Sequence, residues 1–317
     1  MNSKKTTVKI LRDLTALPDT VRGGAVTIGN FDGVHHGHVK IVNRLLERAT
    51  DVKGPAVVFT FDPHPVRILR PEECPPPLTW TERKAELLAS HGVDWSVAYP
   101  TDKSLLSLSA SEFFKRVVCD SLDAKALVEG PNFYFGHNRE GDIAQLRKLV
   151  AQAELTLDVV KPVTANGALV SSSRIRQLLA AGEVNLAGEL LSAPYRIRGM
   201  VMHGAGRGGA QLGFPTANLA AVDTLLPAQG VYAGQGWVGN DSWPAAINLG
   251  SNPTFGDTSV KVEVHLIGCE ESLYGQPMEV DFFARLREIR PFDTTAALKA
   301  QLAKDVQQVC QIAATFP

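Results

Sequence analysis

The first half of the chain alternates short apolar runs with segments in which apolar residues recur at helical spacing. The runs that predict buried strands are residues 25–28, 56–61, 95–99, 126–130 and 155–160. The periodic segments that predict helices are residues 39–49, 81–90, 143–153 and 175–181. Strands that alternate with helices predict an α/β domain, in which a parallel sheet carries helices on both faces.

Two helix starts carry the signature of a capping box, a hydroxyl residue followed three positions later by glutamate. One is formed by Ser109 and Glu112, and the other by Thr79 and Glu82. We expect the helix that follows Thr79 to end at Gly92, because glycine favours the C-terminal cap.

The second half changes character near residues 192–194, where short apolar runs begin to alternate with dense glycine and proline. Residues 260–266 alternate strictly between apolar and polar, which predicts a strand with one buried face. Several such strands joined by glycine-rich turns predict a small closed β-barrel. From Thr294 onward the apolar residues form a helical stripe, so we expect a terminal helix.

These patterns predict two domains, residues 1–190 and 191–317, with a helix over residues 183–191 at the joint. A length of 317 residues fits that division, since it is about twice that of a typical domain. Hydrophobic residues make up 44% of the chain and charged residues 21%, which excludes a largely disordered chain and a coiled coil.

Charge and cysteine usage restrict the partners and the compartment. The formal net charge is −1, so we expect neither nucleic acid nor a membrane as partner, and any phosphate must be held by a local site. The four cysteines are far apart and form no C-x-x-C pair, which favours free thiols in the reducing cytoplasm. The N-terminus has no apolar signal-peptide core, and no run of 18 apolar residues predicts a membrane span. The oligomeric state stays open.

A histidine-glycine turn follows the first predicted strand, where a helix begins. His35 and His38 are three positions apart, so both side chains can reach the same phosphate oxygens, and the helix N-terminus adds free N–H groups. Gly33 and Gly37 allow a close approach of the backbone. This pattern predicts a site that binds a nucleoside triphosphate and stabilises charge on the phosphate under attack, without a covalent nucleophile.

Two other interpretations of these histidines are possible. They could simply cap the helix, or they could belong to a metal site. The metal site would use side chains from His35, His36, His38, Asp62 and His64. The histidine spacing is poor for tetrahedral ligation, however, and Gly37 suits the approach of a phosphate better.

The second candidate site is centred on residues 213–218, Gly-Phe-Pro-Thr-Ala-Asn. Thr216 and Asn218 are two positions apart, so both side chains point the same way in an extended segment. A hydroxyl and an amide oxygen are hard ligands that suit Mg²⁺ bridging ATP phosphates. Glu263 lies on the polar face of its predicted strand and could take a proton from a hydroxyl during phosphoryl transfer.

Both halves resemble the prokaryotic bifunctional riboflavin kinase/FAD synthetase family. The first half matches it at GNFDGVHHGH, FTFDPHP, VEGPNFYFGHNREGD and VSSSRIR, in the order of the family. The second half matches it at residues 213–218, 230–233, 248–250, 252–255, 262–265 and 273–275. The resemblance implies a Rossmann-like nucleotidyltransferase domain followed by a six-stranded barrel. It also implies that riboflavin and ATP give FMN, and that FMN and ATP give FAD with release of pyrophosphate.

The resemblance also implies roles for individual residues. His35 and His38 would engage the ATP phosphates, Asn132 would face the flavin, and Glu263 would be the catalytic base of the kinase. The other residues implied to bind ATP in the adenylyltransferase are Gly29, Asn30, Phe31, Gly37, Ser171, Ser172, Ser173 and Arg176. Those implied to bind ATP in the kinase are Gly213, Pro215, Thr216 and Asn218, with Mg²⁺ near Thr216 and Asn218. Asp62, His64 and Arg139 lie in matched segments, without a role that the sequence defines.

One segment departs from the family pattern. The loop Gly204–Gly213 has its arginine at Arg207 and one extra residue before the Leu-Gly pair. A displaced cation over the ATP phosphates would weaken the kinase, so an adenylyltransferase with a weakened kinase half is an alternative. A flavin-binding sensor without turnover and a histidine-cluster metallohydrolase are further alternatives.

Overall fold

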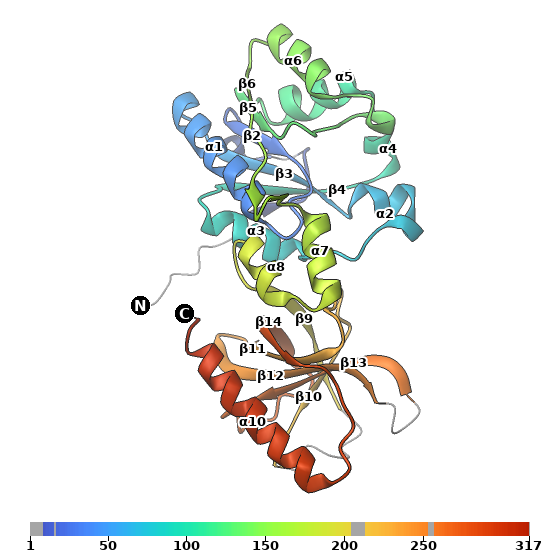
Figure 1. Cartoon of the computed structure of the whole chain (residues 1–317). Coiled ribbons are helices and arrows are strands. Elements are labelled where there is room, and N and C mark those ends of the chain that lie inside the picture. Colours follow the sequence, from blue (N-terminus) through green and yellow to red (C-terminus); the bar gives the residue numbers. More distant parts are fainter. Residues whose placement is uncertain (1–8, 16, 204–212, 253–256, 317) are drawn as a thin grey trace. The chain divides into compact units, whose positions relative to one another are not determined.

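The computed structural model describes residues 9–15, 17–203, 213–252 and 257–316. Residue contacts divide the chain into two compact units, Met1–Pro75 with Trp80–Ser171, and Pro76–Thr79 with Ser172–Pro317. The first unit holds a parallel sheet and the second a closed barrel (Figure 1).

The sheet of the first unit has six parallel strands in the order β1-β4-β3-β2-β5-β6. The strands are β1 (Ile10–Leu11), β2 (Ala25–Ile28), β3 (Ala56–Asp62), β4 (Trp95–Pro100), β5 (Ala126–Glu129) and β6 (Thr156–Val159). The chain runs from β2 to β3 and β4 on one side, then crosses to β5 and β6 on the other. The topological switch point therefore lies between β2 and β5, where open α/β sheets bind their ligands.

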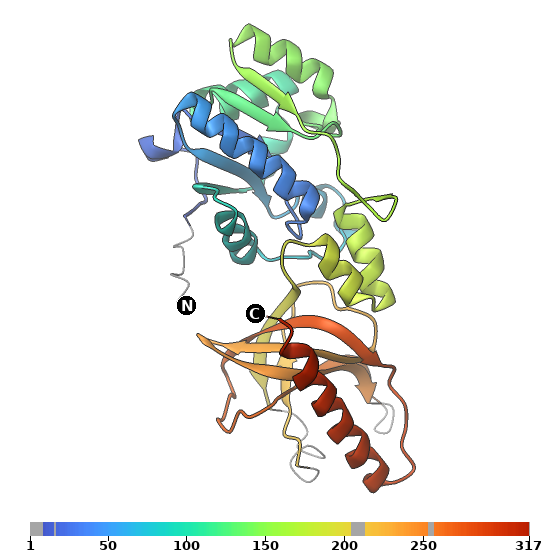
Figure 2. The same cartoon turned by 60° about the vertical axis from the view of Figure 1, so that its left-hand side comes forward.

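Helices cover both faces of this sheet. They are α1 (His36–Val52), α2 (Pro65–Leu69), α3 (Thr81–Ser90), α4 (Lys103–Leu106), α5 (Ala110–Phe113), the π-helix η3 (Phe114–Ser121) and α6 (Ile143–Gln152). In Figure 2, α1 crosses in front of the sheet, and it packs on β2, β3 and β5. Val26 and Ile28 point to the other face, into a core shared with side chains of α5, η3 and α6. The predicted parallel sheet with helices on both faces is confirmed.

The two predicted capping boxes have different outcomes. The box of Ser109 and Glu112 is present at the start of α5. The box of Thr79 and Glu82 is wrong, because α3 begins after Trp80 without a side-chain cap. The Glu82 carboxylate accepts a hydrogen bond from Arg12 Nη2 at 2.9 Å. Gly92 follows α3 with a φ of +93°, as expected for a residue that ends a helix.

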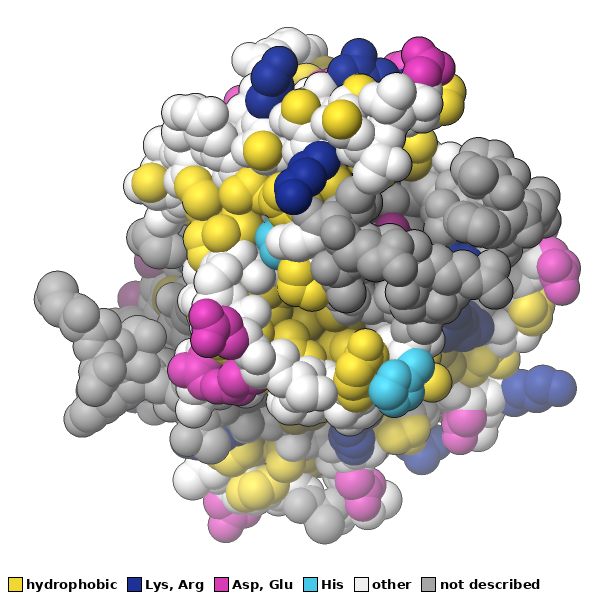
Figure 3. All heavy atoms as spheres, turned by 90° about the horizontal axis from the view of Figure 1, so that it is seen from below, with side chains coloured by type: hydrophobic (Ala, Val, Ile, Leu, Met, Phe, Trp, Pro, Cys, Tyr) yellow, Lys and Arg dark blue, Asp and Glu magenta, His cyan; other side chains and the backbone are white. Residues whose placement is uncertain are grey.

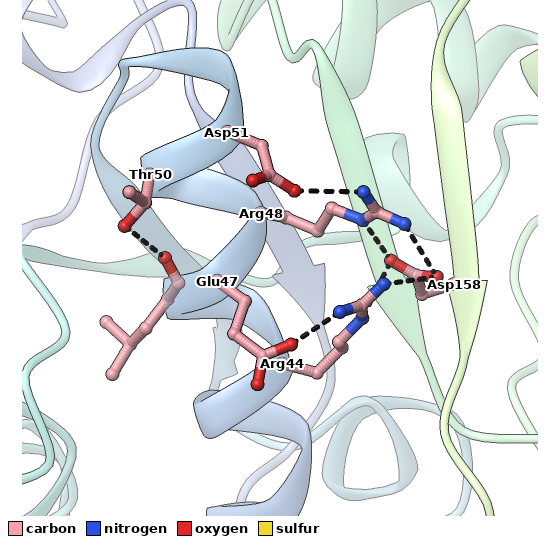
Figure 4. Close-up of polar contacts among 7 residues, drawn as sticks. Arg44, Glu47, Arg48, Thr50, Asp51 and Asp158 are labelled. Carbon is pink, nitrogen blue, oxygen red and sulfur yellow. Dashed lines mark hydrogen bonds and ion pairs between the residues drawn. The ribbon is translucent and has the colours of Figure 1, made fainter.

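Two arginines of α1 bind one carboxylate of β6 (Figure 4). Arg44 donates to Asp158 from Nε at 3.1 Å and from Nη2 at 3.2 Å, and Arg48 donates to the same carboxylate from Nε and Nη2. Arg48 also pairs with Asp51 at 3.0 Å, and Arg44 pairs with Glu47. The two guanidinium groups lower the pKa of Asp158. This network attaches α1 to β6, the strand at the edge of the sheet.

The second unit is a closed antiparallel barrel in the order β10-β13-β12-β11-β14-β9. Its strands are β9 (Tyr195–Met202), β10 (Ala217–Ala220), β11 (Gly230–Val238), β12 (Asp241–Asn252), β13 (Asp257–Leu266) and β14 (Pro277–Arg287). Its helices are α7 (Ser172–Ala181), α8 (Val184–Leu190) and the terminal α10 (Thr295–Ala313). The predicted six-stranded barrel with a terminal helix is confirmed.

Side chains alternate between the two sides of the barrel wall. One row across the strands is buried and consists of Val201, Leu219, Val262 and Leu249. The next row points to the other side of the wall and consists of Asn218, Glu263, Asn248, Val231 and Arg287. The last of these binds α10, since Arg287 Nη2 donates to the buried Asp305 at 2.8 Å.

By contacts, α7 and α8 belong with the barrel and not with the sheet. The domain boundary near residue 190 stays a prediction. The division by residue contacts falls between Ser171 and Ser172 instead. In the described part of the chain, no helix is long and apolar enough to cross a membrane.

Candidate active sites

The first site lies where β2 leads into α1, beside the switch point of the sheet. The backbone pairing between β2 and β5 ends at Val26 and Leu127. Beyond that point, the Glu129 side chain accepts a hydrogen bond from the backbone of β2. Its Oε1 accepts from Ile28 N at 2.8 Å. Glu129 is 2% exposed, and burial raises its pKa well above the usual value. The Glu129 carboxyl group therefore holds the end of β2 next to the site.

The two histidines predicted to bind phosphate are stacked on each other. His35 is the N-cap of α1, and its Nδ1 accepts from His38 N at 3.3 Å. The two ring centroids are 3.6 Å apart, with 13° between the planes. Gly37 permits this packing, because a Cβ atom there would lie 3.0 Å from the His35 ring. Phe31, which is buried, lies with its ring 4.9 Å from that of His38.

Both imidazoles are neutral at physiological pH. Burial lowers the pKa of His35 to about 4, and burial together with the neighbouring His35 lowers that of His38 well below 6.5. Because Nδ1 of His35 accepts a hydrogen bond, its proton is on Nε2, which is left to donate. The site thus offers imidazole hydrogen bonds without imidazolium charge.

Two buried polar atoms of this site have no hydrogen-bond partner among the residues that the structure describes, Asn30 Oδ1 and His38 Nδ1. Buried polar atoms are nearly always satisfied, so a pair without partners at a sheet switch point indicates a polar ligand. The other end of the Asn30 amide lies 2.8 Å from His64 Nε2. His64 Nδ1 in turn accepts from Val66 N at 3.1 Å, so this histidine starts α2 and steadies Asn30.

Asp62, for which the sequence defined no role, is a structural anchor. It accepts from Arg12 at 2.8 Å and from Thr81 at 2.7 Å, and these bonds lower its pKa against the opposing effect of burial. The metal-site interpretation of the histidine cluster finds no support in the structure. Among the described residues, no three His, Cys, Asp or Glu side chains are grouped so that they could hold a metal ion.

The other residues predicted for the adenylyltransferase are divided between the units. Ser171 belongs to the first unit, whereas Ser172 and Ser173 open α7 in the second. Arg176 Nε donates to Pro76 O at 3.1 Å within the second unit. Asn132 is exposed on the loop after β5. On that same loop the Arg139 guanidinium lies 4.6 Å from the centre of the Tyr134 ring.

The second site is the polar row on the wall of the barrel. Asn218 on β10 lies opposite Glu263 on β13, which lies opposite Asn248 on β12. Asn248 Nδ2 donates to Glu263 Oε2 at 3.1 Å. All three side chains are half-buried. The hydrogen bond from Asn248 orients the Glu263 carboxylate, and Asn218 lies opposite it on β10. The sequence analysis missed Asn248, although its position in a matched segment was a usable signal.

An apolar side chain lies next to this row. Gly250 has no side chain, and a Cβ atom there would lie 2.1 Å from Ile289 Cδ1, so only glycine leaves room for Ile289 against β12. Ile289 is 39% exposed. Figure 3, a view from below that of Figure 1, shows hydrophobic side chains gathered near the middle of that side.

The segment 213–218 approaches the same row from β10. Gly213 has a φ of +83°, Pro215 O accepts from His265 Nδ1 at 2.7 Å, and Thr216 is exposed. Hydroxyl and amide oxygens next to a carboxylate are a donor set that fits Mg²⁺, which keeps most of its other ligands as water or phosphate oxygen. The remaining part of the loop Gly204–Gly213, including Arg207, lies outside the described residues.

These features define a two-unit chain with a nucleotidyltransferase-type α/β fold and a small phosphotransferase-type barrel. The first part matches the family model described as FAD synthetase over residues 17–174, and the second matches the model described as riboflavin kinase over residues 191–313. The chain belongs to the family of bifunctional riboflavin kinase/FMN adenylyltransferases, as the following relatives also show, and has the two activities of FAD biosynthesis that this family name states.

Curated relatives match over nearly their whole length. The bifunctional riboflavin kinase/FMN adenylyltransferase of Pseudomonas fluorescens is 37% identical over 97% of this chain and 98% of its own. The protein of the same name from Escherichia coli K12 is 33% identical over 94% and 96%. A solved structure described as a macrolide-efflux protein from Streptococcus pneumoniae has a TM-score of 0.83 at 29% identity, and the match covers 94% of this chain and 97% of that one. This last likeness supports the fold.

Proposed function

We propose that the stacked histidines carry the adenylyl transfer and that the polar row of the barrel carries the phosphorylation of riboflavin. For the first reaction, the supporting observation is the neutral imidazole pair at the N-terminus of α1, next to buried polar atoms without partners. For the second, it is the direct line of Asn218, Glu263 and Asn248 across three strands.

In the adenylyltransferase, a phosphate oxygen of FMN attacks the α-phosphorus of ATP, and pyrophosphate leaves. His35 and His38 hold the phosphates through ring N–H groups, with Gly29, Asn30, Phe31 and Gly37 shaping the backbone around them. Ser171, Ser172, Ser173 and Arg176 retain the pyrophosphate, and Asn132 faces the flavin. No covalent intermediate is needed, so positioning and charge stabilisation supply the catalysis.

In the kinase, Glu263 accepts the proton of the terminal ribityl hydroxyl as its oxygen attacks the γ-phosphorus of ATP, and ADP leaves. Asn248 holds the carboxylate of Glu263 in place through its hydrogen bond. Thr216 and Asn218 would hold Mg²⁺, which when bound offsets the charge of the phosphates. Gly213 and Pro215 shape the segment that approaches the ATP, and the apolar surface at Ile289 suits an isoalloxazine ring.

The test is product analysis of the purified chain with riboflavin, ATP and Mg²⁺. We expect FMN and ADP first, then FAD and pyrophosphate. Robust formation of FMN would remove the alternative of a weakened kinase half, which the loop at Arg207 motivates. Bound flavin without release of ADP or pyrophosphate would instead support a sensor. We place the reactions in the cytoplasm and the functional boundary near residue 190, as the sequence predicts.

A further inference from the structure

The histidine pair brings no positive charge to the adenylyltransferase site. Neutral imidazoles donate hydrogen bonds but do not offset the charges of a triphosphate and of the leaving pyrophosphate. The pKa values of His35 and His38 are too low for either ring to be an imidazolium at pH 7. A cationic side chain near the two rings would supply, next to the histidines, a charge that the rings do not.

Among the lysines and arginines that the structure describes, only Lys84 is buried, with 8% of its surface exposed. Its Nζ donates to Thr60 Oγ1 at 3.4 Å, and Thr60 Oγ1 donates to Asn30 O at 3.2 Å. The ammonium on α3 is thus linked through one hydroxyl to the loop that carries the histidines. Neither the motifs nor the proposed mechanism assigns Lys84 a role.

Titratable groups near Lys84 include two carboxylates and the side chain of His38. The carboxylates of Asp32 and Asp62 raise its pKa, whereas burial, the larger effect, lowers it. The field of the ammonium is also one of the causes that lower the pKa of His38. Asp62 already binds Arg12 and Thr81, and Arg12 is shared with Glu82.

Burying an ammonium group is a poor way to stabilise a fold. Its desolvation costs several kcal/mol, and an apolar side chain of similar volume often stabilises a fold as well or better. Lysine is accordingly among the residues found least often in protein interiors. Lys84 is buried and is linked through Thr60 to the backbone carbonyl of Asn30, whose own Oδ1 has no partner among the described residues, as His38 Nδ1 has none. Such an arrangement fits a site that receives an anion.

We propose that Lys84 is a further substrate-binding residue of the adenylyltransferase, and that its ammonium, together with His35 and His38, holds the phosphates of ATP and of the leaving pyrophosphate. This inference rests on the proposed function of the histidine site. In this arrangement the imidazoles at the start of α1 bind the phosphates by hydrogen bonds, and the lysine of α3 binds them by its charge.

The test is Lys84→Met, which removes the charge and keeps an unbranched side chain of similar length. FAD formation from supplied FMN and ATP should show a KM for ATP raised about tenfold or more, with inhibition by pyrophosphate weakened by a similar factor. The KM for FMN should stay within about twofold of the wild-type value. Lys84→Arg, which keeps the charge, should recover most of the lost ATP affinity.

Two controls come from the same chain. Lys115→Met removes an exposed ammonium from the first unit, where Lys115 pairs with Asp120 at 2.8 Å, and should leave the KM for ATP unchanged. The kinase activity of each variant, measured as FMN formation, reports whether the second unit is intact. The thermal unfolding of Lys84→Met reports the same for the first unit.

An unchanged KM for ATP in Lys84→Met would overturn the proposal. So would equal rises in the KM values for ATP and FMN, or a lower unfolding temperature with failure of Lys84→Arg to recover affinity, because each of these indicates a structural lysine. If the wild-type chain forms no FAD from FMN and ATP, the proposed function of the histidine site fails first, whatever the variants show.

Discussion

The two candidate sites differ in how they hold their reactive side chains. In the first unit, two imidazoles are stacked at a helix start, buried and neutral, with a buried carboxyl and a buried lysine nearby. In the barrel, a half-buried carboxylate lies in a row between two asparagines on the wall. Burial controls the chemistry of the first site, whereas strand register controls that of the second. The two sites should therefore respond to different perturbations.

The largest effect is expected at the proposed base of the kinase. Glu263→Gln keeps the size of the side chain but removes proton acceptance, so FMN formation should fall by about 10²- to 10⁴-fold. FAD formation from supplied FMN should stay within about twofold, since none of the residues proposed for it is Glu263. Kinase turnover near the wild-type rate would show that Glu263 is not the base.

The reciprocal variant is His38→Ala. Loss of one phosphate hydrogen bond in a buried site should lower FAD formation by about 10²- to 10³-fold and leave FMN formation intact. Chromatography of both products from one reaction measures this. If FMN formation fell in parallel, the two sites would not be independent, and the comparison above would be wrong.

Acid should destabilise the first unit through the buried histidines. The pKa of His35 is about 4 in the folded chain and near 6.5 when unfolded, so below pH 6.5 the unfolded chain binds a proton that the folded chain does not. This costs roughly 2 kcal/mol of unfolding free energy at pH 5, and the stability is fully present above pH 6.5. Denaturant unfolding of His35→Asn should show a smaller loss between pH 7.5 and pH 5. An equal loss in both proteins would exclude His35 as the cause.

Asn248→Ala tests the register of the barrel. The variant removes the 3.1 Å hydrogen bond to Glu263, so FMN formation should fall by about tenfold while FAD formation is unaffected. Gln235→Ala removes a side-chain hydrogen bond to Ser242 on the same barrel and serves as the matched control. A similar loss of FMN formation in both variants would point to general damage of the barrel.

The smallest effect is expected at the arginine network of α1. Asp158→Asn removes the charge shared by Arg44 and Arg48, and partly exposed pairs of this kind contribute about 1 kcal/mol. Heating should then inactivate FAD formation at a lower temperature than in the wild type, with FMN formation unchanged. The same shift in both activities would mean that the network does not act on the first unit alone.

Much of this molecule could be predicted from local sequence. The strand and helix periods predicted the sheet and the barrel, because burial on one face imposes a period of two or of 3.6 on apolar residues. The histidine turn was correctly placed at a strand end and a helix start. The capping box at Thr79 was misplaced, since α3 begins one residue later, after Trp80.

The sequence by itself determined the element types, the order of the two units and the residue types available for chemistry, all of which depend on spacing along the chain. Only the tertiary structure decided which residues are buried together and hence what charge they carry. Burial lowers the pKa values of the two imidazoles, packing links Lys84 to Thr60, and register brings Asn248 to Glu263. These properties arise from contacts between distant segments, since desolvation and charge depend on neighbours in space and not on neighbours along the chain.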